Sequence, residues 1–159
     1  MTSDAPQLNR PSVIPALSYT DARKAFEWLQ EAFGFEPEMA IEDEAGNLVH
    51  SELRFGDGLI MVGSEWHEST KSPLNTNRCC TTTTHLKIDT DIDAHCARAR
   101  AAGAEIIAEP ETQFYGDRTY RARDHEGHIW TFGQTVQEMA PSEWDAAVGT
   151  KTTMGRAGS

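Results

Sequence analysis

The 159-residue sequence predicts an α+β fold of two tandem βαβββ modules, with the helices outside two curved mixed sheets. The first observation is an internal repeat offset by 69 residues, which aligns Gly34 with Gly103 and Gly58 with Gly127. The second is that each repeat carries one helical pattern and then three short strand patterns. Because about 60 residues bury little core alone, the modules are expected to pack together or against another chain.

The first module is predicted to span residues 10–64. A strand pattern leads to an amphipathic helix whose apolar residues recur at spacings of three and four, and Gly34 supplies its left-handed end. The glycine-containing turns AGN and GDG separate the following strands. The predicted strands of this module lie near 13–20, 35–42, 47–55 and 58–64.

The second module is predicted to span residues 82–134 and to repeat this order. Its helix is expected over 91–102, displaced by one residue relative to the offset of 69, and it ends at Gly103. Its predicted strands lie near 83–89, 105–109, 117–124 and 128–133.

Two further segments complete the predicted organisation. Residues 65–81 are polar, contain a proline and show no periodicity, which indicates a linker or a lid. Residues 135–159 form a tail with one short helix expected over 141–148.

The net charge of −11 argues against nucleic acid or an anionic membrane as a partner. No apolar run is long enough to span a bilayer, and the N-terminus shows no secretory signal. The three cysteines form an odd number, which favours reduced thiols and a cytoplasmic protein.

Polar side chains gather on the sheet face that points away from each predicted helix. Side chains alternate along a strand, so the apolar residues of each strand mark the helix side and the others mark the opposite side. This opposite side is either a solvated sheet face or the lining of a cleft. Its predicted residues are His50, Glu52, Arg54, His85, Lys87, Asp89, Thr119, Arg121, Arg123, Ile129 and Thr131.

Two stretches, YTDARKAFEWLQEAFGFE at 19–36 and FYGDRTYRARDHEGHIWTFGQ at 114–134, resemble the vicinal-oxygen-chelate superfamily. That group holds glyoxalase I, extradiol dioxygenases, and fosfomycin- and bleomycin-resistance proteins. The resemblance implies the tandem βαβββ fold, a small-molecule ligand and a homodimer, since members often build each cleft from modules of two chains.

The resemblance also implies four metal-ligand positions, which the repeat carries over to Ala16, Val62, His85 and Thr131. Of these residues, only His85 is a metal ligand, so no metal cofactor is expected. A non-standard site from His50, Glu52 and His85 stays open as an alternative, because all three are predicted on the polar face.

The favoured function is a small-molecule enzyme with isomerase-type or lyase-type proton transfer on an oxygenated substrate. The proton carriers would be His50, Glu52 or His85. Arg54, Arg121 or Arg123 would hold an anionic group, and Glu52 is expected to pair with one of these arginines. Further candidate substrate-binding residues are Trp66, Tyr115 and Thr131. The alternative is a non-catalytic protein that binds and sequesters a small molecule, as bleomycin-resistance relatives do.

Overall fold

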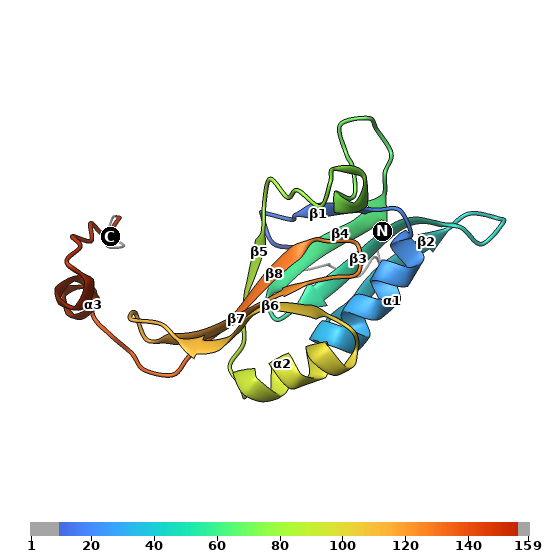
Figure 1. Cartoon of the computed structure of the whole chain (residues 1–159). Helices are drawn as coiled ribbons and strands as arrows, with labels where there is room; N and C mark the ends of the chain where they lie inside the picture. Colours follow the sequence, from blue (N-terminus) through green and yellow to red (C-terminus); the bar gives the residue numbers. More distant parts are fainter. Residues whose placement is uncertain (1–9, 156–159) are drawn as a thin grey trace, which may run out of the picture. The chain divides into compact units, whose positions relative to one another are not determined.

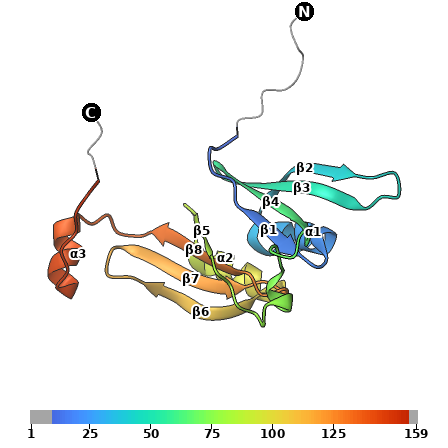
Figure 2. The same ribbon diagram turned by 90° about the horizontal axis from the view of Figure 1, so that it is seen from above.

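A computed structural model describes residues 10–155. The chain forms two compact units, Met1–Cys79 and Cys80–Ser159. The division lies inside the predicted linker of residues 65–81. Each unit contains one βαβββ module, and in each the helix covers one face of its own four-stranded sheet (Figure 1 and Figure 2). The predicted tandem fold is confirmed.

The first module has strand order β1-β4-β3-β2, with β1 parallel to β4 and the other neighbours antiparallel. Its helix α1 (Ala22–Phe33) begins where the Asp21 carboxylate accepts a hydrogen bond from the Lys24 N–H. It ends at Gly34, whose φ of 81° is the left-handed conformation that glycine adopts most readily. The strands are β1 (Ala16–Tyr19), β2 (Glu36–Glu42), β3 (Leu48–Phe55) and β4 (Gly58–Ser64).

The second module repeats this topology as β5-β8-β7-β6. Its helix α2 (Ile92–Ala101) is capped by Asp91 and packs on the sheet through Ile92, Cys96 and Ala99. The sheet side of this core holds three fully buried aromatic residues, Tyr120, Trp130 and Phe132. The strands are β5 (Thr84–Lys87), β6 (Glu105–Thr112), β7 (Asp117–Arg123) and β8 (Ile129–Thr135).

The strand register shows that the predicted repeat offset of 69 residues is wrong at the last strand of each module. In the parallel pairs, Ala16 lies opposite Met61, whereas His85 lies opposite Thr131. The offset is therefore 70 at this strand, because the turn between β7 and β8 is one residue longer than the turn between β3 and β4. The residue equivalent to Thr131 is Met61, and the predicted equivalent, Val62, is wrong: Val62 is buried on the helix side.

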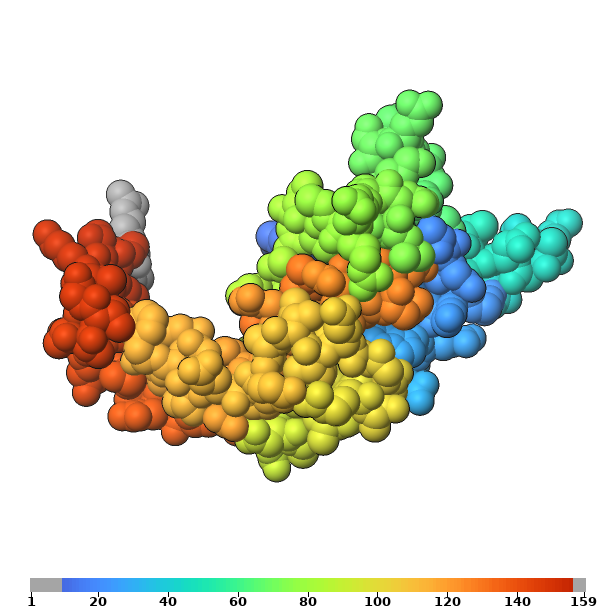
Figure 3. Space-filling model, viewed as in Figure 1, coloured from blue at the N-terminus to red at the C-terminus, as the bar shows by residue number. Residues whose placement is uncertain are grey.

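The segment after β4 forms an ordered loop of the first unit. The Glu65 carboxylate accepts hydrogen bonds from the Ser72 N–H and the Asn75 side chain, which shapes the turn into the 3-10 helix η1 (Pro73–Asn75). Part of this loop, shown in green, projects from the surface of its unit (Figure 3), and Trp66 within the loop is exposed.

The tail contains α3 (Pro141–Val148), where the sequence predicts a short helix. Residues 156–159 of the predicted tail lie outside the described residues. Among residues 10–155, no helix is long and apolar enough to cross a membrane.

Candidate functional site

The predicted alternation of faces is confirmed in both modules. In the first module, Leu53 and Val62 are buried on the helix side, and the ion pairs of Glu52 and Arg54 lie on the other side. In the second module, Ala122 is buried on the helix side, and its neighbour Arg121 is exposed on the other. The polar residues singled out from the sequence therefore share one face of each sheet.

Glu52 lies at the centre of the polar face of the first module and is only 2 % exposed. Its two carboxylate oxygens accept hydrogen bonds of 2.7 Å from the two terminal nitrogens of Arg10. His50 Nε2 lies 2.9 Å from the same carboxylate. The Arg10 hydrogen bonds and, to a smaller extent, those of His50 lower the pKa of Glu52 from 4.5 to about 2. Glu52 is therefore a fixed anion at neutral pH.

This arrangement corrects the expected partner of Glu52. The residue that holds the carboxylate is Arg10, which precedes the first strand and has no place in either periodic pattern. Arg54 binds Glu38 through two hydrogen bonds of 2.9 Å, and Arg123 lies 3.7 Å from Glu105. Two of the three proposed anion-binding arginines are thus already paired with carboxylates.

The Glu52 carboxylate also orients His50. A carboxylate only accepts hydrogen bonds, so Nε2 carries a proton in this pair, and in the neutral imidazole Nδ1 is the acceptor. His50 is half-buried and lines a pocket of about 230 Å³ between β1, β3 and β4. Most of the remaining lining is apolar, and Trp66 stands at this pocket with 78 % of its surface exposed.

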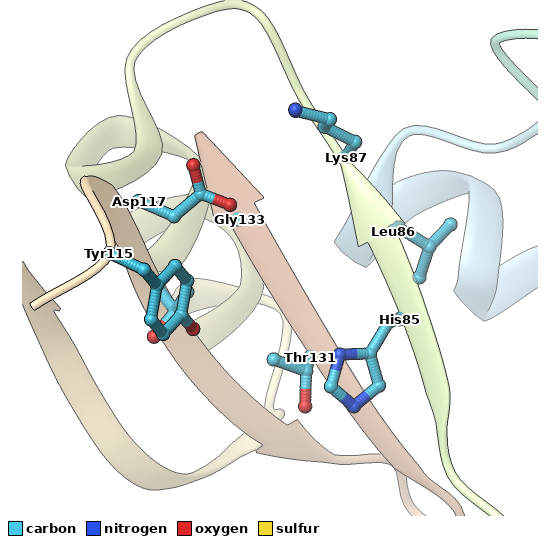
Figure 4. Close-up of a pocket in the computed structure, with 8 residues that line it drawn as sticks. His85, Leu86, Lys87, Tyr115, Asp117, Thr131 and Gly133 are labelled. Atoms are coloured by element: carbon cyan, nitrogen blue, oxygen red, sulfur yellow. The ribbon is translucent and has the colours of Figure 1, made fainter. Parts of the chain in front are cut away.

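The second module has a pocket of about 200 Å³ at the corresponding place (Figure 4). His85 and Thr131 lie side by side on the paired strands β5 and β8, and the Tyr115 ring lies across the pocket from them. Lys87 and Asp117 occupy its other end. Each of the two pockets has room for a fragment such as one ring system and its substituent, below the 300 Å³ or more of a complete drug-sized site.

Thr131 joins this pocket to Arg121. The Arg121 Nε donates a hydrogen bond of 3.1 Å to the hydroxyl of Thr131, a buried residue. The structure thus brings together Tyr115, His85, Thr131 and Arg121 in the second module, and His50, Glu52 and Trp66 in the first.

Sequence reasoning missed three residues of these sites, namely Lys87 and Asp117 in the second module and Arg10 in the first. Lys87 lies on the predicted polar face and lines the second pocket, and its alternation with His85 along one strand is the sequence signal for it. Arg10 gave no signal, because a single arginine in a segment without periodicity can reach many positions on a sheet.

The residues at the superfamily's four metal-ligand positions do not fit a metal. With the corrected register these are Ala16, Met61, His85 and Thr131, of which only His85 is a common ligand. Within residues 10–155, no group of three or more histidine, cysteine, aspartate or glutamate side chains could hold a metal ion. The alternative site is also not assembled within either module, since His50 and Glu52 belong to one unit and His85 to the other.

Comparison with known proteins places this arrangement in a family. Residues 13–132 match the family model described as Glyoxalase/Bleomycin resistance protein/Dioxygenase superfamily. An uncharacterized protein of Mycobacterium bovis is 33 % identical over 141 residues, which cover 87 % of this chain and 92 % of that protein.

Solved structures agree with this match. TioX from Micromonospora sp. ML1 is similar with a TM-score of 0.60 and 32 % identity, covering 77 % of this chain and 97 % of TioX. TnmS3, an antibiotic binding protein from Streptomyces sp. CB03234, has the same fold with a TM-score of 0.58 and 18 % identity, covering 77 % and 93 % of the two chains. With its tandem βαβββ modules, the chain belongs to the glyoxalase/bleomycin resistance protein/dioxygenase superfamily.

Proposed function

We propose that this protein binds a planar aromatic small molecule at the polar faces of its sheets and thereby sequesters it. The observation that carries the proposal is the exposure of aromatic side chains at the pockets: Trp66 is 78 % exposed beside the first pocket, and Tyr115 is 39 % exposed in the second. Large aromatic side chains left in water beside a pocket favour a flat ligand that covers them.

Two further observations support binding rather than chemistry. Glu52 is held as an anion by Arg10, so it serves as a hydrogen-bond acceptor and not as a base near neutral pH. The superfamily's metal-ligand positions carry residues that do not form a metal site. A fold shared with TnmS3, which is described as an antibiotic binding protein, is consistent with this role.

Replacing Trp66 with alanine is expected to weaken binding of a planar aromatic ligand about tenfold, which corresponds to about 1.4 kcal/mol of binding free energy. The reason is that the ligand loses the indole ring on which one of its faces stacks. Trp66→Phe should retain most of the affinity, since a smaller ring still stacks. A thermal-shift screen of flat heteroaromatic compounds identifies the ligand, and calorimetry then measures each variant.

Trp144→Ala is the matched control, because Trp144 lies on α3 and lines neither pocket. Equal affinities of the Trp66→Ala variant and the unmodified protein for every hit of the screen would contradict this binding mode.

One observation favours an enzyme as the second candidate. The hydrogen bond between His50 and the buried Glu52 is the pairing that fixes a histidine as a proton acceptor, here at Nδ1. Such a residue would support the isomerase or lyase chemistry beside a carbonyl that the sequence favours. Chromatography of the ligand after incubation separates the two functions: an unchanged ligand supports sequestration, and conversion that His50→Gln abolishes supports the enzyme.

We also propose that the protein is a cytoplasmic homodimer. Each module of this size buries a limited core, and a twofold dimer is the commonest way for a chain to cover the remaining apolar surface. Cys79, Cys80 and Cys96 form no disulfide within the described residues, which is consistent with a reducing compartment. Light scattering at micromolar concentration should give twice the 17.6 kDa chain mass, and a value near 17.6 kDa would refute the dimer.

A further inference from the structure

We propose that the ligand carries a single anionic oxygen group, such as a carboxylate or an ionised phenol, and that the second module binds it through Arg121, Lys87 and His85. This inference rests on the proposed binding function and names the chemical class of the ligand. It comes from the charges on the polar face of the second module.

The first argument is the pairing of the arginines on the strands. Of the four strand arginines, Arg54 pairs with Glu38, Arg118 with Asp93 and Arg123 with Glu105. Arg121 differs from the other three, since within the described residues its hydrogen bond goes to the neutral Thr131 hydroxyl. In a chain with a net charge of −11, an exposed arginine without a carboxylate partner is a strong indication of an anionic ligand.

The second argument is the register of the strands. Thr131 lies opposite Arg121 on one side and opposite His85 on the other, so these three residues form one row across β7, β8 and β5. The hydrogen bond from Arg121 Nε to Thr131 fixes the guanidinium along this row and leaves its terminal nitrogens to bind a ligand.

The adjacent row provides the second positive charge and the space. Thr119, Gly133 and Lys87 lie opposite one another on the same three strands. Gly133 has no side chain, so it leaves space above the sheet in the middle of this row. The Lys87 ammonium lies at the edge of the pocket (Figure 4). An oxygen group between the two rows would meet hydroxyl, imidazole and ammonium donors at once.

Asp117 limits the charge of the ligand to one. Its carboxylate accepts a hydrogen bond of 2.8 Å from the Thr135 hydroxyl and lines the same end of the pocket as Lys87. With Arg121 and Lys87 positive and Asp117 negative, these three side chains together carry one net positive charge. This charge matches a monoanion and repels a cation.

The first module does not offer the same charge. The residue equivalent to Arg121 is Glu52, and its charge is cancelled by the two hydrogen bonds from Arg10. Its pocket is lined mainly by apolar residues and Trp66. The repeat has therefore diverged in charge, and the anionic group is assigned to the second pocket, where Tyr115 supplies an aromatic side chain within the same module.

The experiment compares 2-naphthoate, 2-naphthamide and 2-naphthamidine, which share one ring system and differ in charge. Binding to the full chain is measured by nuclear magnetic resonance titration at low and high salt. We expect the carboxylate to bind about tenfold more tightly than the amide at low salt, with a smaller difference at high salt.

Arg121→Gln should weaken binding of the carboxylate much more than binding of the amide and so remove this preference, and Lys87→Gln should reduce the preference in part. Arg118→Gln is the matched control, because Arg118 lies on the helix side of the same strand and pairs with Asp93.

The outcomes separate the two proposals. If the amide binds as tightly as the carboxylate, if the amidine binds best, or if Arg121→Gln keeps the preference, the anionic class is wrong while the binding function stands. If none of the three probes binds, the binding function itself fails, and the inference fails with it.

Discussion

Replacing Asp124 with alanine is expected to lower the free energy of unfolding by at least about 3 kcal/mol. The Asp124 carboxylate is buried in the turn between β7 and β8, where one oxygen accepts the N–H groups of Glu126, Gly127 and His128. The other oxygen accepts the indole N–H of the buried Trp130. Alanine leaves several buried donors without this acceptor, and each such loss costs about 1–3 kcal/mol.

Urea unfolding followed by circular dichroism measures this change. Asp124→Asn is the informative control, because its amide oxygen can still accept the three backbone N–H groups while its NH2 group faces the Trp130 donor. Its loss of stability should lie between those of the unmodified protein and Asp124→Ala. An alanine variant within about 1 kcal/mol of the unmodified protein would show that the carboxylate is not needed.

This turn also controls the second pocket. It contains the extra residue that changes the repeat offset from 69 to 70, and it sets the register in which Arg121 lies opposite Thr131. We therefore expect Asp124→Ala to lose ligand binding in parallel with stability.

The fold could be predicted from the sequence because its signals are local and repeated. The alternation of apolar residues divided the side chains of each strand between the two faces of its sheet. The glycines after the helices marked where each helix ends. The same alternation placed His50, Glu52, Arg121 and Thr131 on the polar face, where the structure has them.

The chemistry of the site could not be predicted in the same way. Alternation says which face a side chain occupies, but not which long side chain reaches it from another segment. Arg10 reaches Glu52 over 42 residues of chain, and Arg54 reaches Glu38 over 16. Likewise, one extra turn residue shifted a strand by one position and moved the equivalent of Thr131 from Val62 to Met61.

Protonating Glu52 is expected to lower the free energy of unfolding by up to about 3 kcal/mol. This value follows from the shift in the pKa of Glu52, since each pKa unit corresponds to about 1.36 kcal/mol. The pKa of Glu52 is lowered from 4.5 to about 2 in the folded state, chiefly by Arg10. The unfolded chain therefore takes up a proton first as the pH falls. This contribution is fully present above pH 4.5 and is lost between pH 4.5 and about 2.

Arg10→Gln should flatten this pH dependence, because the carboxyl loses the partner that keeps it ionised. Urea unfolding at several pH values between 2 and 7, together with a nuclear magnetic resonance titration of the Glu52 carboxyl, measures both effects. Arg23→Gln is the matched control, since its pair with Glu42 is exposed and should contribute little.

The titration of Glu52 also decides whether Glu52 itself could act as a base, whereas the role of His50 as a proton acceptor in the enzyme alternative needs the ionised carboxylate. A carboxyl that titrates far below pH 4.5 stays charged through the physiological range, anchors Arg10 and His50, and leaves the polar face of the first module ready to bind but without a carboxylate base. A carboxyl that titrates near pH 7 would mean that Arg10 does not hold it in solution. Glu52 would then be matched to proton transfer at neutral pH, and the enzyme would become the better account of this site.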